Sequence, residues 1–168
     1  MSESERARLR RARIGFIFQK FNLLKALSAL ENVEVALRLA GCPAGDARRR
    51  AAHALDAVGL CARLRALPQD LSGGEQQRVA VVRALVTAPA IILADEPTGS
   101  LDSANGRIVL DMICSHARGR AAAAVIVTHD HRVRAVVDRE LWMEDGMLAE
   151  PGAAAERIER SLEPGEKA

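Results

Sequence analysis

Aromatic residues are scarce in this chain. Among its 168 residues there are no tyrosines, one tryptophan and three phenylalanines, so aromatics make up 2% of the sequence. Hydrophobic residues nevertheless make up 49%, which is enough to build the core of a single domain of this length. We therefore expect a core made of leucine, valine, isoleucine and alanine.

An excess of charge of one sign is also lacking. The 24 lysines and arginines and the 22 aspartates and glutamates leave a formal net charge of +2. Domains that bind nucleic acid usually carry a strongly basic surface, so we expect no nucleic-acid partner. The five arginines within residues 1–13 are interpreted as the solvated face of a short helix.

Cysteines are few, and an apolar leader and long hydrophobic runs are missing. Cys42, Cys61 and Cys114 are odd in number and too widely spaced for a metal site, and they suit a reducing compartment. The first residues are serine, glutamate and arginine, which do not resemble a signal peptide. The longest apolar runs, such as residues 121–127, are too short to cross a bilayer. These observations predict a cytoplasmic protein, for which any link to a membrane comes through a partner.

A glycine-bearing helix start is the first motif with chemical content, in residues 71–75. Ser72 occupies the N-cap position before an apolar helical pattern. Gly73 and Gly74 leave the N–H groups of the first turn open, and a helix N-terminus with open N–H groups binds phosphate oxygens. An ordinary capped helix would carry the same residues, so this motif taken alone favours phosphate only modestly.

Two carboxylates follow an apolar strand pattern and form the second motif. Residues 91–94 are predicted to form a buried parallel strand. Asp95 and Glu96 then lie at its carboxyl end, where open α/β sheets bind their ligands. One carboxylate can hold Mg²⁺ through water, and the next can act as general base on an attacking water. Two acids that merely end a strand are the alternative, but both motifs in one chain favour a nucleotide site.

These stretches resemble the motifs of ATP-binding cassette (ABC) ATPases, in the order in which that family carries them. Residues 71–75 are similar to the signature motif, and residues 91–96 to the Walker B strand with its catalytic glutamate. Three further stretches complete a resemblance that covers residues 5–150: the strand entering the Q-loop at Phe16–Gln19, the D-loop at Ser100–Asp102, and the switch histidine at Thr128–Asp130.

Within the family, the lipoprotein-release and macrolide-export branch is the most similar. The similarity to this branch lies in four short stretches: Phe18-Gln19, Asn22-Leu23-Leu24, Glu31-Asn32-Val33 and Met143-Glu144-Asp145-Gly146. The resemblance implies an α/β fold of the P-loop NTPase (RecA-like) class, with a mostly parallel sheet and an inserted helical subdomain. It also implies that the bound groups are ATP and Mg²⁺.

The resemblance implies a role for each matching residue. Catalytic roles fall to Glu96, His129 and Gln19, and metal contacts to Asp95 and Gln19. The nucleotide-binding residues that it implies are Ser72, Gly73, Gly74, Glu75 and Asp102.

The resemblance also implies partners. Two subunits would enclose two ATP molecules, each between the Walker motifs of one subunit and the signature of the other, and hydrolysis would drive a transmembrane permease. The expected assembly is a dimer of this chain with itself or with a complete homologue. Its expected location is cytoplasmic, at the inner face of the cell membrane through the permease.

One motif of the family does not occur in this sequence. The Walker A loop, Gly-x-x-x-x-Gly-Lys-Ser/Thr, cradles phosphates with backbone N–H groups and a lysine. None of the three lysines, Lys20, Lys25 and Lys167, follows a glycine in that arrangement. We therefore expect a fold that is incomplete at the N-terminus and a chain that is inactive as an ATPase alone. A non-catalytic partner subunit that donates only the signature and a soluble ABC ATPase outside transport are the alternatives.

The expected organisation has three parts. Residues 1–150 would form a partial ABC ATPase domain, residues 28–87 its helical signature subdomain, and residues 151–168 a flexible tail. Ser28 and Asp46 are expected to cap the first two helices of the subdomain, and Ser103 a later helix that Gly119 ends. Further strands are predicted at residues 14–18, at 139–144 before a hairpin turn, and, as a buried strand, at 123–127.

Overall fold

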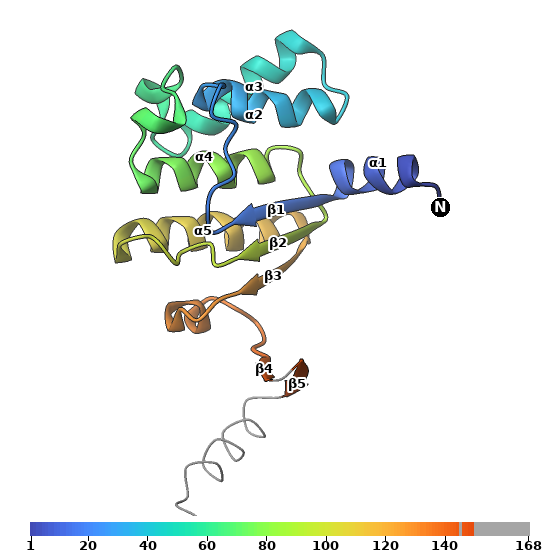
Figure 1. Cartoon of the computed structure of the whole chain (residues 1–168), viewed down its shortest axis with the longest axis vertical. Helices are drawn as coiled ribbons and strands as arrows, with labels where there is room; N and C mark the ends of the chain where they lie inside the picture. Colours follow the sequence, from blue (N-terminus) through green and yellow to red (C-terminus); the bar gives the residue numbers. More distant parts are fainter. Residues whose placement is uncertain (145, 150–168) are drawn as a thin grey trace, which may run out of the picture. The chain divides into compact units, whose positions relative to one another are not determined.

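The structure, a computed structural model, describes residues 1–144 and 146–149. The chain forms two compact units, residues 1–131 and 132–168, and each is described by itself. In the larger unit, α1 (Glu3–Arg13) is a largely exposed helix, as the arginine-rich start predicted. It leads directly into the first strand of the sheet (Figure 1).

Three parallel strands form the sheet of the larger unit. They are β1 (Ile14–Phe18), β2 (Ile91–Asp95) and β3 (Ala123–Val127), in the spatial order β1-β2-β3. Phe18 is level with Asp95, and Asp95 with Val127. The residues that follow the three strands therefore leave the sheet at a common carboxyl edge, the edge at which α/β sheets bind ligands.

One face of the sheet is covered by α4 (Gly73–Leu85) and α5 (Ser103–Arg120). The strand residues Ile17 and Ile92 pack there against Val81 of α4 and Ile113 of α5. The opposite face is exposed through the side chains of Phe16, Phe18, Ile91, Val125 and Val127. The strands predicted at 91–94 and 123–127 therefore both form, but their predicted burial is wrong on this face, where Ile91, Val125 and Val127 are exposed, because the described residues place no helix over it.

A second core lies in the helical region between β1 and β2, as the resemblance implied. This region contains α2 (Ala29–Leu39), α3 (Ala44–Asp56), η1 (Cys61–Arg63) and η2 (Pro68–Asp70), and Figure 1 shows α2 and α3 above α4. Its buried residues, among them Leu37 and Leu55, pack on Val79 and Val82 of α4. Since Val81 of the same helix faces the sheet, α4 belongs to both cores.

The starts of α2 and α4 follow the predicted caps. The side chains of Ser28 and Ser72 each accept a hydrogen bond from the backbone N–H three residues later. The residue at that position is a glutamate in both helices, and its carboxylate accepts a bond from the serine N–H in return. The Ser-x-x-Glu spacing encodes this reciprocal capping box, so a local pattern fixes both helix starts.

The predicted cap of α3 is wrong. The helix starts at Ala44, directly after Pro43, and no side chain caps it. Asp46 lies inside the first turn and pairs with Arg49 at 2.9 Å. Proline fixes the φ that the entry into a helix requires, and an aspartate in the first turn still complements the helix dipole.

Both predicted ends of α5 are displaced. Asp102, one residue before the predicted Ser103, caps the helix and accepts a 2.9 Å hydrogen bond from the N–H of Asn105. The helix continues through Gly119 to Arg120. A single glycine costs a helix only about 1 kcal/mol, which the packing of an eighteen-residue helix offsets.

The short helix η3 (His131–Ala135) begins at the last residue of the larger unit, and its other residues belong to the second unit. The second unit also contains a short antiparallel pair, β4 (Trp142–Glu144) and β5 (Met147–Ala149). The strand predicted from residue 139 thus begins three residues later. Arg134 pairs with Glu140 at 2.8 Å and lies 5.5 Å above the Trp142 ring. Asp145 of the predicted hairpin turn and the predicted tail at 151–168 lie outside the described residues. Across the described ranges, no helix is long and apolar enough to span a membrane.

Candidate functional site

The carboxyl edge of the sheet brings the predicted catalytic residues together. Gln19 follows β1, Glu96 follows β2, and His129 comes two residues after the end of β3. These three positions are far apart in sequence, and the parallel register places them side by side. The geometry is what an α/β sheet requires of residues that act on one ligand.

Glu96 is held by the segment that follows β3. Thr128 Oγ1 donates to Glu96 Oε2 at 2.9 Å, and the His129 backbone N–H donates to Oε1 at 3.2 Å. His129 Nδ1 lies 2.7 Å from the same Oε1. The side chain of His129 is 80% exposed, so the remainder of the ring stays accessible to a ligand. No role was assigned to Thr128 from the sequence, although Thr128 belongs to the predicted switch-histidine stretch at residues 128–130.

Glu96 has a strained backbone conformation and a lowered pKa. Its φ is 45°, in the left-handed region, which costs an L-residue roughly 1–2 kcal/mol. Such strain persists where the surroundings impose it, commonly at functional sites. Partial burial works to raise the pKa of the Glu96 carboxyl, but the hydrogen bonds from His129 and Thr128 outweigh burial, and the pKa lies below its ordinary value of 4.5. The carboxylate is therefore charged at neutral pH and able to accept a proton.

Gln19 and Glu96 converge on Gly99. A Cβ at Gly99 would lie 3.2 Å from Gln19 Nε2 and 3.4 Å from Glu96 Oε2, so the glycine leaves room for both side chains. Asp95, the last residue of β2, is exposed beside them. The carboxyl edge thus presents two carboxylates and one amide to solvent.

The helix α4 begins with the predicted signature residues and is called the signature helix below. Its N-terminus is capped by its own side chains. Ser72 and Gly73 are exposed, and Ser72 Oγ accepts the N–H of Glu75 at 3.3 Å. The carboxylate of Glu75 accepts the N–H of Ser72 at 2.8 Å and the Nε–H of Arg63 at 2.9 Å. The Arg63 guanidinium, followed by the Ser72 N–H, lowers the pKa of Glu75. Glu75 is thus turned toward its own helix end and toward Arg63.

Asp102 lies at the start of α5 and is linked to the signature helix through Asn105. Asp102 accepts the backbone N–H of Asn105 at 2.9 Å and its side-chain amide at 2.6 Å, and these bonds lower the pKa of Asp102. Asn105 Oδ1 in turn accepts Arg78 Nη1 of α4 at 2.6 Å. A Cβ at Gly74 would lie 2.7 Å from the Asn105 side chain, so this approach requires glycine.

A buried glutamine connects the helix that carries the signature residues, α4, to the segment that follows Glu96. Gln77, one turn into α4, donates from Nε2 to the Pro97 carbonyl at 2.8 Å, directly after Glu96. Thr98, also buried, donates to Asp130 Oδ2 at 2.7 Å. Neither contact was predicted, because each joins residues that are 20 or more positions apart and no local pattern marks them.

A parallel sheet with an acid, an amide and an imidazole at its carboxyl edge, together with a capped glycine-bearing helix start between two of its strands in sequence, is typical of α/β proteins that bind phosphate-bearing ligands. A family profile described as "ABC transporter" matches residues 1–99. The chain belongs to the ABC transporter family.

Relatives support the branch that the sequence resembled. The chain is 47% identical over 148 residues to the lipoprotein-releasing system ATP-binding protein LolD 2 of Chlorobaculum tepidum, covering 88% of this chain and 60% of that protein. It is 47% identical over 145 residues to the macrolide export ATP-binding/permease protein MacB of Rhodospirillum rubrum, covering 86% and 22%. The chain thus spans about 60% of the LolD 2 length. The resemblance to the lipoprotein-release and macrolide-export branch is confirmed.

A solved structure confirms the fold class. The dimeric post-hydrolysis state of the ATP-binding cassette MJ0796, bound to ADP and Pi, superposes with a TM-score of 0.80 at 37% identity. The match covers 89% of this chain and 68% of that chain. The P-loop NTPase class predicted from the motifs is therefore correct.

Proposed function

We propose that this chain provides the ATP-binding part of an ABC transporter of the lipoprotein-release or macrolide-export type and takes part in ATP hydrolysis. The observation that carries this proposal is the strained Glu96, held by Thr128 and His129 at the sheet edge beside Gln19. Family membership and the similarity to the LolD 2 and MacB proteins support it. The proposed location is the cytoplasmic face of the cell membrane, reached through a permease.

The proposed bound groups are ATP and Mg²⁺. Asp95 offers an exposed carboxylate, and Gln19 an amide oxygen, from adjacent strand ends. Mg²⁺ with a nucleotide usually takes one or two such protein oxygens, besides waters and phosphate oxygens, so the donor set fits. Among the described residues, no group of three or more acidic, histidine or cysteine side chains could hold a metal ion by itself. The proposed Mg²⁺ would therefore depend on phosphate and water oxygens for its other ligands. When bound, Mg²⁺ neutralises phosphate charge.

Glu96 is the proposed general base. Its lowered pKa keeps the carboxylate charged at neutral pH. Oε1 already contacts two groups of His129, and Oε2 accepts the Thr128 hydroxyl, so Oε2 is the oxygen with a lone pair to accept the proton of a water aligned for attack. His129 and Thr128 fix the orientation of that carboxylate. Gln19 lies next to it at Gly99 and is proposed to position the water and the metal.

The proposed nucleotide contacts of the signature act across a dimer. The exposed Ser72 hydroxyl and the N–H group of the exposed Gly73 lie at the positive end of α4, whereas Gly74 is buried against Asn105. We assign Ser72 and Gly73 to the nucleotide of a second subunit, with Gly74 allowing the close packing beneath them. Glu75 and Asp102 contribute by holding the starts of α4 and α5.

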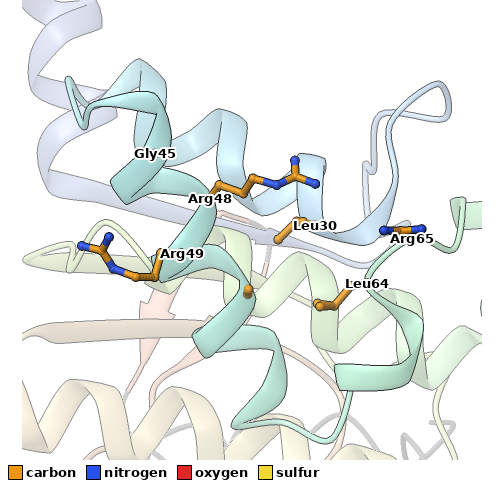
Figure 2. Close-up of a pocket in the computed structure, with 7 residues that line it drawn as sticks. Leu30, Gly45, Arg48, Arg49, Leu64 and Arg65 are labelled. Carbon is orange, nitrogen blue, oxygen red and sulfur yellow. The ribbon is translucent and has the colours of Figure 1, made fainter.

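The permease contact is proposed at a hollow on the helical region. This hollow, of about 420 Å³, has the apolar residues Leu30, Ala52 and Leu64 together with Arg48 and Arg65 in its lining. Figure 2 shows Arg48 and Arg65 beside Leu30 and Leu64. The chemistry suits a cytoplasmic permease segment that offers an apolar side chain flanked by carboxylates.

The proposal is tested in a chimera that places before residue 1 an N-terminal segment of an ABC ATPase chosen because it carries the Gly-x-x-x-x-Gly-Lys-Ser/Thr loop. Glu96→Gln keeps the shape and hydrogen-bonding capacity but removes the base, so we expect turnover to fall by about 10²–10⁴-fold while ATP binding is kept. Glu3→Gln, at an exposed position in α1, is the matched control and should behave as the parent. A Glu96→Gln chimera that hydrolyses ATP at the parental rate would refute the assignment.

A further inference from the structure

A full negative charge lies at the N-terminus of the signature helix. The Glu75 carboxylate accepts the Ser72 N–H at 2.8 Å, so its charge is held beside the residue that caps the helix. The pKa of this carboxyl is lowered, first by the Arg63 guanidinium and then by the Ser72 N–H. Glu75 is therefore ionised at neutral pH, and an anion that approaches this helix end meets its charge.

The charge of Glu75 opposes the binding of phosphate. A helix N-terminus carries roughly half a positive charge, which is what attracts phosphate oxygens to it. The full negative charge of Glu75 more than cancels that partial charge. Without a compensating cation, the start of α4 would repel a triphosphate instead of binding it.

Arg63, in η1, supplies the compensating charge. Its Nε donates to Glu75 Oε1 at 2.9 Å and its Nη2 to Oε2 at 3.3 Å, so the planar guanidinium meets the carboxylate with two bonds. Nη2 also donates to the Asp70 carbonyl at 3.1 Å, and the charge of Asp70 acts on Arg63 as well. The Arg63 side chain is 44% exposed, so its charge lies at the surface, where it can attract an anion at the helix end.

Stability alone does not account for this ion pair. An ion pair at the protein surface contributes little to stability. The capping box that Glu75 forms with Ser72 also works with glutamine in place of glutamate, and a glutamine would bring no charge. The glutamate therefore needs Arg63 for a reason other than the cap.

We propose that Arg63 neutralises Glu75 and thereby allows the start of α4 to bind the triphosphate of a second subunit's nucleotide. Arg63 is a positioning residue that acts through Glu75. With Arg63 in place, the partial positive charge of the helix end is no longer cancelled. This inference rests on the proposed function, which assigns Ser72 and Gly73 to that nucleotide.

A mixed dimer measures the effect on nucleotide binding across the interface. The partner is a full-length ABC ATPase chosen because it carries the Gly-x-x-x-x-Gly-Lys-Ser/Thr loop, with its signature serine changed to arginine and its catalytic glutamate changed to glutamine. This partner should bind ATP without hydrolysing it and should depend on our chain for a working signature. The dissociation constant of the pair is measured with and without ATP and Mg²⁺, and the ratio of the two values reports the signature contact.

Four variants separate charge compensation from a structural role. In Arg63→Gln, we expect the ATP-dependent association to weaken at least about fivefold at low salt, and less at about 0.5 M salt, where exposed charges are screened. Arg63→Lys, which keeps the charge, should lose less. Since Glu75→Gln removes the need for compensation, the double variant Arg63→Gln with Glu75→Gln should bind within about twofold of the unchanged chain. Arg38→Gln, which removes the same charge from an exposed site on α2, is the matched control and should bind as the unchanged chain does.

The two proposals fail in different ways. If ATP gives the unchanged chain no added affinity for its partner, the proposed signature role fails and the role of Arg63 falls with it. If ATP strengthens the pair and Arg63→Gln binds as the unchanged chain does, compensation by Arg63 is overturned while the proposed function stands. A double variant as weak as Arg63→Gln would also overturn it, because Arg63 would then act independently of the charge of Glu75.

Discussion

Replacing Asn32 with alanine should destabilise the larger unit by about 3 kcal/mol. Asn32 is completely buried at the start of α2, and its Oδ1 accepts the Leu24 N–H at 2.8 Å. Its Nδ2 donates to the carbonyls of Leu24, Leu27 and Ser28 at 2.9–3.1 Å. The two N–H groups of Nδ2 are shared among three carbonyls, and Oδ1 accepts one further bond. The side chain therefore makes three hydrogen bonds at a time, each contributing about 1 kcal/mol net to stability. The alanine would remove the side-chain partner of the Leu24 N–H and the Leu27 carbonyl, whereas the carbonyls of Leu24 and Ser28 keep the backbone N–H groups of Leu27 and residue 32.

Urea denaturation followed by circular dichroism measures this loss. With an m-value of about 2 kcal/mol/M, the midpoint should fall by about 1.5 M at unchanged m. Gln69→Ala, at an exposed position, is the matched control and should change the free energy of unfolding by less than about 0.5 kcal/mol. A loss below about 1 kcal/mol for Asn32→Ala would show that the backbone groups find other partners, and the reasoning from its hydrogen bonds would be wrong.

Three further predictions concern pH, packing and the dimer. The pKa of Glu75 is lowered in the folded state, so the free energy of unfolding should fall as pH drops below about 4.5; an equally steep fall in Glu75→Gln would exclude this contribution. Gly74→Ala should lower the free energy of unfolding by about 1–3 kcal/mol, because the new Cβ would lie 2.7 Å from the Asn105 side chain. Gly119→Ala, with open space around it, should raise the free energy of unfolding by about 0.5–1 kcal/mol. Thermal midpoints of the two variants equal to that of the unchanged chain would contradict both expectations. The last prediction concerns a mixed dimer of this chain with a full-length homologue whose own signature motif is disabled, so that ATPase activity requires the signature of this chain. There, Ser72→Arg in this chain should abolish ATPase activity and Glu96→Gln in this chain should not, and the opposite result would refute signature donation in trans.

Much of the fold was predictable because its signals are local. The Ser-x-x-Glu pattern gives the starts of α2 and α4, and short apolar runs give all three strands of the sheet. The motif residues Gln19, Glu96 and His129 follow these strands, so a parallel sheet brings them to one edge without further information.

The remaining features depend on contacts between distant parts of the chain. Arg83 meets the Phe21 carbonyl across 62 positions, and Thr128 meets Glu96 across 32, and neither pair leaves a mark in the sequence pattern. The exposure of β3 was missed for a related reason. An apolar run indicates a strand but does not say whether another layer covers its second face.

The position of α4 in two cores has a consequence for unfolding. Val79 and Val82 pack in the helical region, and Val81 and Ala84 pack against the sheet, so melting this one helix removes buried surface from both clusters at once. Neither cluster can therefore lose its order while the other keeps its full packing. Residues 1–131 should accordingly unfold in a single cooperative transition, with the amides of α4 among the slowest to exchange.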